Sequence, residues 1–244
     1  MILKFASKTD IGRQRRTNQD SYAVGELPVG VAWAVVCDGM GGTNGGSIAS
    51  TLAVKTISEQ ISTSWRQGMG PNSIVNMLKS SVTAANMNVF DMSQSVESLQ
   101  GMGTTVVAVI VCNNTAHIVH AGDSRAYRIT KDGIKQITRD HSIVQTMIET
   151  GKLTEAEARV HPRKNVITRA LGVSESLDVD YNEIDLGEGE GVLICTDGLT
   201  NFVLESDINK IIAETPFFEY PEKLINSANE NGGGDNITVV AISR

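Results

Sequence analysis

The sequence predicts an α+β fold in which antiparallel sheets pack on each other and helices cover the outside. Three observations predict it: short Val- and Ile-rich segments bounded by Gly, Asp or Asn, amphipathic helical patterns between some of them, and strands that follow one another directly. A doubly wound parallel sheet would instead alternate strand and helix regularly. With 244 residues, 41% of them hydrophobic and 20% charged, the chain can bury a sizeable core, which excludes disordered and fibrous classes. We expect one domain over residues 1–244.

Six segments have the length and composition of strands. They are Val31–Cys37, Thr104–Cys112, Ala116–His120, Arg125–Ile129, Gly191–Cys195 and Ile237–Ile242. The second, third and fourth follow each other with only short turns between them, which favours antiparallel hairpins.

Helical patterns fill much of the remaining sequence. Ser47 is expected to cap a helix with apolar positions from Ile48 to Ile61, and Ser73 a helix with apolar positions from Ile74 to Val89. A short helix is expected from Ser142 to Glu149 with Gly151 as its stop, and Thr154 is expected to cap another. Two more are predicted at Glu205–Glu214 and Glu219–Glu230.

Charge and cysteine use limit the partners and the compartment. The chain has 21 Lys and Arg against 28 Asp and Glu, a formal charge of −7, and no basic cluster longer than Arg15-Arg16, so we expect no nucleic-acid partner. No apolar run reaches the ~18 residues of a membrane span, and the first residues lack the pattern of a signal peptide. The three cysteines each end an apolar run and are interpreted as buried, reduced thiols, which predicts a cytoplasmic protein.

Four aspartates share one context, because each lies at an end of a predicted strand: Asp38, Asp123, Asp197 and Asp235. Taken singly, each is most simply explained as turn chemistry. Together, four such ends could bring four carboxylates to one rim, where like charges raise one another's pKa values and require cations. Oxygen ligands suit Mg²⁺ or Mn²⁺, and two divalent ions would leave a nearly neutral site able to accept a phosphate. Binuclear metal-assisted hydrolysis follows from this arrangement.

Other phosphate-binding motifs fit less well. The segment Gly12–Asp20 contains arginines whose forked guanidinium groups suit phosphate, although a solvated basic turn is the alternative. The glycine-rich segment after Asp38 has Ser47 where a P-loop requires lysine, so its glycines are interpreted as backbone packing near the site. A cysteine phosphatase would need arginine six residues after its nucleophile, where this chain has Thr43, Ile118 and Asn201.

The chain resembles, nearly end to end, the metal-dependent protein serine/threonine phosphatases of the PP2C or PPM family, and in particular their compact bacterial members. The motifs that carry the resemblance are RRTNQD (15–20), VVCDGMGG (35–42), GMGTT (101–105), AGDSRAY (121–127), DHS (140–142), HPRKNVITRALG (161–172), LICTDGLT (193–200) and GGDNITVV (233–240). The resemblance implies a four-layer αββα sandwich, two antiparallel β-sheets flanked by helices on both outer faces. It also implies Mn²⁺ or Mg²⁺ as cofactor, with two ions in the core site and a third, weaker ion.

The resemblance also implies roles for individual residues. Asp38 would bridge the two core metals, with the Gly39 carbonyl on one of them, and Asp197 and Asp235 would complete the other. Asp123 would hold the third metal together with Asp197, and Arg15 would clamp the substrate phosphate. Asp20, Gln19 and Asn236 would support the metal ligands and their water from behind. A hydroxide bridging the metals would attack phosphorus directly, without a phosphoenzyme.

Two positions depart from the family pattern. Met40 and Thr43 stand where many relatives carry a histidine, the candidate proton donor, and Gln19 stands where some have glutamate. An alternative function is therefore a catalytically silent metal- or partner-binding module that keeps the fold. Residues 141–165 correspond to the family's flap beside the active site. We expect a monomer that acts on phosphorylated protein substrates and opposes a Ser/Thr kinase.

Overall fold

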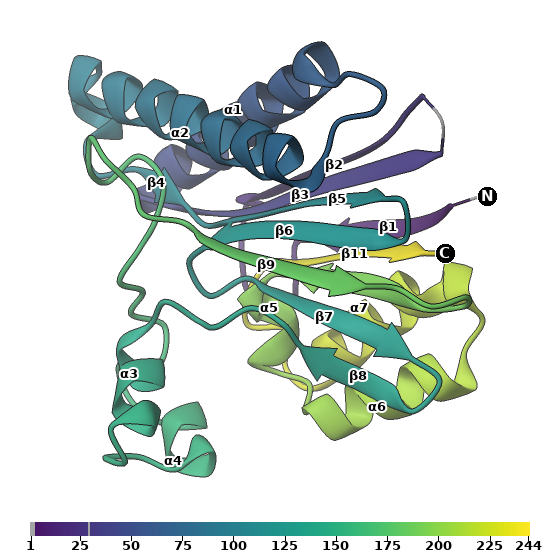
Figure 1. Ribbon diagram of the computed structural model, residues 1–244. Coiled ribbons are helices and arrows are strands. Elements are labelled where there is room, and N and C mark those ends of the chain that lie inside the picture. The colour runs from purple at the N-terminus through teal and green to yellow at the C-terminus, as the bar shows by residue number, and fades with distance from the viewer. Residues whose placement is uncertain (1–2, 29) are drawn as a thin grey trace.

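The structure is a computed structural model that describes residues 3–28 and 30–244, apart from the side chains of residues 43 and 44. Figure 1 shows two sheets stacked face to face between two layers of helices, with a small helical segment extending from one end and both termini at the opposite end. The predicted αββα arrangement is confirmed. In the described ranges, no helix combines the length and apolar character needed to cross a bilayer.

Both sheets are antiparallel throughout. The first sheet has the order β1 (Lys4–Asp10), β11 (Ile237–Ser243), β10 (Gly191–Cys195), β7 (Arg125–Thr130) and β8 (Gly133–Gln136). The second has the order β2 (Asp20–Leu27), β3 (Val31–Met40), β5 (Val106–Cys112), β6 (Thr115–Ala121) and β9 (Asp180–Asp185), with the short β4 (Gly103–Thr104) paired to the end of β3.

The predicted strands are the inner ones, and the edge strands β1, β8, β2 and β9 escaped prediction. Inner strands are covered on both faces: Val36 and Val109 of the second sheet pack with Ile194 and Val240 of the first in the core between the sheets. Edge strands are half exposed and keep polar residues, as in the DYNEID sequence of β9. They therefore lack the apolar run that reveals a buried strand.

The helices form the two outer layers (Figure 1). They are α1 (Gly42–Ser64) and α2 (Pro71–Ser95) on the second sheet, α5 (Asp197–Thr200), α6 (Glu205–Glu214) and α7 (Tyr220–Glu230) on the first, and α3 (Ile143–Glu149) and α4 (Glu155–Arg159) in the extending segment. Short 3₁₀ turns lie at Glu97–Leu99 and Phe217–Glu219.

Two of the three predicted helix caps are wrong. Thr154 forms a capping box with Glu157 on α4, as expected. Ser142, the expected start of the third helix, caps α3 by accepting the Gln145 N–H. Ser47, however, lies inside α1, which begins at Gly42 after a turn made by Gly41 at φ 124°. Ser73 lies inside α2, which begins at Pro71 because proline suits the first helical position.

Candidate metal centre and active site

The four aspartates at the predicted strand ends line one cavity of about 460 Å³. Asp38 comes from β3, Asp123 from the loop between β6 and β7, Asp197 from the start of α5 and Asp235 from the loop before β11. Simple turn chemistry does not describe Asp38 or Asp197, because β3 continues through Gly39 to Met40 and α5 begins at Asp197.

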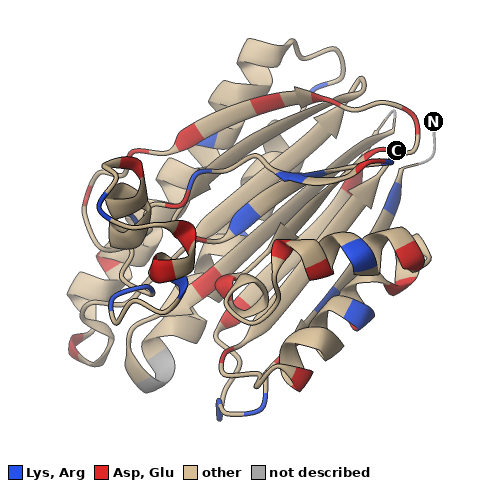
Figure 2. Ribbon diagram, turned by 90° about the horizontal axis from the view of Figure 1, so that it is seen from below, with Lys and Arg blue, Asp and Glu red and all other residues tan. Residues whose placement is uncertain are grey.

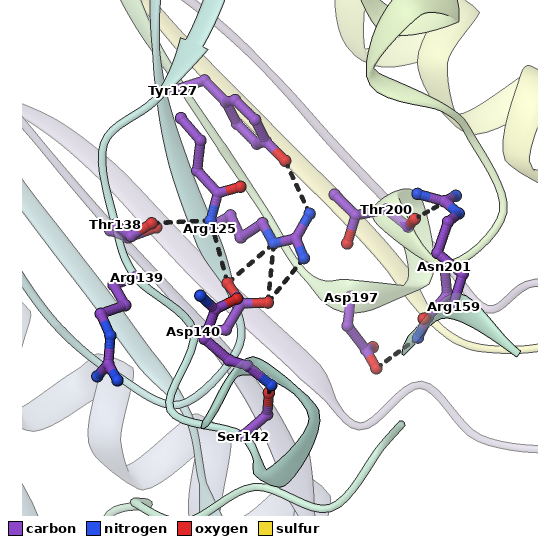
Figure 3. Close-up of polar contacts among 12 residues, drawn as sticks. Arg125, Tyr127, Thr138, Arg139, Asp140, Ser142, Arg159, Asp197, Thr200 and Asn201 are labelled. Atoms are coloured by element: carbon purple, nitrogen blue, oxygen red, sulfur yellow. Dashed lines mark hydrogen bonds and ion pairs between the residues drawn. The ribbon is translucent and has the colours of Figure 1, made fainter. Parts of the chain in front are cut away.

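Local hydrogen bonds fix the backbone of Asp38 and the side chain of Asp197. The Asp38 N–H donates to the Thr105 hydroxyl at 3.0 Å, and the Asp38 carbonyl accepts the Thr105 N–H at 2.9 Å. The Asn201 amide donates to Oδ2 of Asp197 at 2.8 Å, a contact drawn in Figure 3. These contacts leave the Oδ1 atom of Asp197 buried and without a hydrogen-bond partner.

Burial and mutual repulsion make the ionised carboxylates unfavourable in the protein alone. Burial, followed by the charge of Asp20, raises the pKa of Asp38 well above its usual range. Burial, followed by the charge of Asp197, does the same to the pKa of Asp123. Burial raises the pKa of Asp197 to about 6, with Asp235 adding to the shift. A cluster of acids in this state is stabilised by bound cations.

The donor set fits hard divalent ions. The cavity offers carboxylates and the Gly39 backbone, while Cys37 and Cys195 pack in the cores beneath the helices. Among the described residues, the one group of three potential ligand atoms within 4.8 Å of one another lies elsewhere, at His120, His141 and Asp180. The aspartates are therefore spread around the cavity, an arrangement that suits Mg²⁺-like ions, which complete their shells with water.

Asp20 lies behind the cavity and is buried. Its Oδ2 accepts hydrogen bonds from the hydroxyls of Thr196 (2.9 Å) and Thr238 (2.7 Å), whereas its Oδ1 is buried and unpartnered. Burial raises the pKa of Asp20 to about 7 despite these hydrogen bonds. Asp20 and Asp197 thus each have one buried carboxylate oxygen without a hydrogen-bond partner. Bound cations and their water molecules would provide the missing partners.

Asn236 holds the segment that carries Arg15. Its amide donates to the carbonyls of Ile11 (2.9 Å) and Thr17 (3.0 Å), and its side-chain oxygen accepts the Gln19 N–H at 2.8 Å. Gln19 also lines the cavity, and its side-chain amide donates to the Gly42 carbonyl at 2.7 Å. Arg15 is thereby placed on the rim, half exposed, with its guanidinium 2.7 Å from the Asp235 carboxylate.

Glycines let the strand and helix backbones approach each other at the cavity wall. A Cβ atom on Gly39 would lie 2.0 Å from the Gly46 carbonyl oxygen, and one on Gly46 would lie 2.7 Å from the Gly39 carbonyl oxygen. No side chain fits at either position, which agrees with the interpretation of this segment as backbone packing.

The segment of α3 and α4 extends beside the cavity and covers a second cavity of about 240 Å³, which shares Asp123 and Asp197 with the first. Figure 3 shows two contacts that secure it: Arg125 binds the Asp140 carboxylate at 2.7–3.1 Å, and Arg159 of α4 donates to the Thr200 carbonyl of α5 at 3.1 Å. The AGDSRAY and DHS motifs contain Arg125 and Asp140, but the sequence gives no sign that they pair.

The surrounding charges do not supply a general attraction for phosphate. Figure 2 shows acidic and basic positions mixed along α6 and α7, and the chain as a whole has a net charge of −7. Arg15 and Arg16 are the described cationic residues that line the cavity together with the aspartates.

Comparison with known proteins agrees with this geometry. Residues 12–239 match the family described as Protein phosphatase 2C. The serine/threonine phosphatase stp of Listeria innocua is 35% identical over 241 residues, which cover 97% of this chain and 94% of that protein. The S. agalactiae serine/threonine phosphatase superposes with a TM-score of 0.92 at 32% identity over 99% of both chains. The catalytic domain of the phosphatase PstP, solved in complex with 2 manganese ions, superposes with a TM-score of 0.87 at 30% identity over 99% of this chain and 98% of that one.

Proposed function

The chain belongs to the protein phosphatase 2C family and is a metal-dependent protein serine/threonine phosphatase, and we propose which of its residues carry out the reaction. The observation that supports the assignment is the cavity in which Asp38, Asp123, Asp197 and Asp235 lie together with Arg15. The missing histidine allowed the alternative of a catalytically silent module. The comparisons favour a phosphatase instead, since the named relatives are phosphatases.

Two ions, Mn²⁺ or Mg²⁺, are proposed for the core site. Asp38, the Gly39 carbonyl, Asp197 and Asp235 would hold them. The unpartnered Oδ1 of Asp197 supports this assignment. Asp123 and Asp197 would hold a third, weaker ion, which is supported by their shared place in both cavities.

Bound ions of this kind supply a nucleophilic water at neutral pH and offset charge on the phosphoryl oxygens. Arg15 would bind two phosphoryl oxygens with its forked N–H groups, and its Nη2 already donates to the Asp235 carboxylate. Asp20 would accept a hydrogen bond from water through its free Oδ1. Asn236 and Gln19 would act on the site by holding the backbone of residues 11–19 and the start of α1.

The proton for the departing seryl or threonyl oxygen is proposed to come from water. Met40 lines the cavity but has no proton to give, the side chain of Thr43 lies outside the described residues, and no described lining residue is a histidine. A solvent-derived proton then replaces a histidine general acid.

We further propose one catalytic domain over residues 1–244, with residues 141–165 as its flap. It would act as a monomer in the cytoplasm on phosphorylated proteins, opposite a Ser/Thr kinase. Three buried, unpaired cysteines support a reducing compartment.

Hydrolysis of a phosphothreonine peptide with and without Mn²⁺ tests the proposal. Activity is expected with Mn²⁺, and both EDTA and Asp38→Asn are expected to lower it by more than about 100-fold. Asp132→Asn, an exposed acid in the turn after β7, is the matched control and should leave the rate unchanged. Full activity of Asp38→Asn would refute the proposed roles.

A further inference from the structure

Outside the active-site cavity, His120, His141 and Asp180 form a cluster that has the composition of a metal site. Its geometry argues against one. The two imidazole rings stack at 4.7 Å with an angle of 6° between them, so no point lies in both ring planes, where the nitrogen lone pairs point. The Arg169 guanidinium also binds Asp180 at 2.7 Å and lies 3.1 Å from Nε2 of His141, a place that a second cation would have to share.

The cluster serves instead to hold the peptide of Gly122. The backbone N–H of Gly122 donates to the ring nitrogen Nδ1 of His141 at 3.1 Å, and the backbone N–H of His141 donates to the Gly122 carbonyl at 2.9 Å. A nitrogen that accepts a hydrogen bond carries no proton, so the proton of the neutral ring lies on Nε2. Nε2 is 3.3 Å from the Asp180 carboxylate, the acceptor that suits a protonated Nε2 and so favours the tautomer that Gly122 requires. In this tautomer the 3.1 Å contact of Nε2 with Arg169 is not a hydrogen bond, because both groups are donors, and the Arg169 guanidinium binds Asp180 instead.

Asp123 follows Gly122 and is thus held from one side by His141. From the other side, the hydroxyl of Ser124 lies 2.7 Å from that of Thr105, which also accepts the Asp38 N–H. Gly122 has φ +110°, and a Cβ atom there would lie 2.6 Å from the Thr105 side chain, so the loop requires glycine at this position. The hydrogen bonds of Gly122 and Ser124, the residues on either side of Asp123, therefore hold the backbone that carries the Asp123 carboxylate.

We propose that His141 is a positioning residue that sets the Asp123 carboxylate in place for cation binding, with Asp180 fixing the tautomer of His141. The inference rests on the proposed function, in which Asp123 holds the third, weaker ion. Groups that orient metal ligands typically change affinity by about 10–100-fold when removed. His141 touches none of the reacting atoms and acts only through the Gly122 peptide.

Two amide substitutions separate positioning from simple space filling. His141→Asn places Oδ1 at the position of Nδ1 and keeps an acceptor for Gly122, whereas His141→Gln is closer in size to histidine but places its oxygen one bond further out. Both lose the stacking on His120, so they are matched in that respect. The free Mn²⁺ remaining after titration of the metal-free full chain, read by electron paramagnetic resonance, reports each binding event without any enzyme assay.

The parent should show two tight events and one weak event that Asp123→Asn removes. We expect His141→Gln to weaken the weak event by about tenfold or more and His141→Asn to keep it within about threefold, with the tight events unchanged in both. Equal behaviour of the two amides, or no weak event sensitive to Asp123→Asn, would overturn the inference. Failure of the proposed function would look different, because the parent would then show no tight binding and no Mn²⁺-dependent hydrolysis.

A measurement on the parent protein tests the inference even if the His141 variants do not fold. The ¹⁵N chemical shifts of the His141 ring report which nitrogen is protonated, and we expect a proton on Nε2 and none on Nδ1. A protonated Nδ1 could not accept the Gly122 N–H and would overturn the inference without any substitution.

Discussion

Arg15 and Asp235, near opposite ends of the chain, lie 2.7 Å apart at the rim of the active-site cavity. The ion pair, with burial opposing it, raises the pKa of Arg15 further above its usual value, so this guanidinium stays charged at any working pH. Arg15 remains half exposed, which leaves it able to contact a substrate phosphate.

Arg15→Ala is expected to lower kcat/KM for a phosphothreonine peptide by about 10–100-fold, because a forked cation for the phosphoryl oxygens is lost. The kcat/KM of Arg15→Lys should lie between those of the parent and Arg15→Ala, since lysine keeps the positive charge but not the forked pair of N–H groups. Steady-state kinetics at saturating Mn²⁺ check this. Arg128→Ala, which removes an ion pair with Glu190 away from the cavity, is the control. If Arg15→Ala and Arg128→Ala gave equal rates, Arg15 would not bind the phosphate.

The stability of the metal-free protein should fall as the pH rises from about 4 to 7 through the titration of Asp20. Burial raises its pKa to about 7, so the folded state keeps a proton that the unfolded state releases above about pH 4. His117, His120 and His141, whose pKa values are lowered by burial, act in the opposite sense below about pH 6.5. The comparison with Asp20→Asn separates the two effects.

Urea unfolding in EDTA, at pH 5 and at pH 8, measures this difference. The free energy of unfolding of Asp20→Asn, relative to the parent, should rise by about 2–3 kcal/mol between the two pH values. A difference between variant and parent that stays constant with pH would show that Asp20 does not titrate in this range.

Breaking the Arg125–Asp140 pair should lower the free energy of unfolding far more than breaking a surface pair. Arg125 makes three hydrogen bonds to Asp140, whose side chain is only 10% exposed. Asp140→Ala leaves a largely buried guanidinium unpaired and should cost about 3 kcal/mol in urea unfolding. Glu222→Ala breaks the exposed pair with Lys8 and should cost less than about 1 kcal/mol. Equal costs for the two variants would contradict the buried role of the pair.

Arg159→Ala should loosen the flap without unfolding the protein. Its hydrogen bond to the Thr200 carbonyl joins α4 to α5, the helix that begins with Asp197. Amide exchange in residues 143–159 should become about fivefold faster, while exchange in β5 and β10 stays unchanged. Exchange rates in 143–159 equal to those of the parent would show that other contacts hold the flap.

The sequence was sufficient to predict the inner strands and the gathering of the acids, for physical reasons. Strands such as β5 and β10 are buried on both faces and therefore consist of continuous apolar residues, and each carboxylate follows or precedes such a segment. Asp20, by contrast, lies on the edge strand β2, whose polar sequence hides both the strand and the depth at which the acid is buried.

Contacts between distant loops could not be predicted. The hydrogen bonds between His141 and Gly122, and those between Asn236 and residues 11–19, depend on how the two sheets stack. The caps of α1 and α2 were misplaced for a local reason, because Gly41 and Pro71 start these helices before the serines that resemble caps.

The most direct test of the account is an anomalous difference map from a crystal of the protein grown with Mn²⁺ and recorded at the manganese edge. We predict two strong peaks in the cavity, bridged by Asp38 and flanked by Asp197 and Asp235. An empty cavity, or peaks at His120, His141 and Asp180 instead, would contradict it.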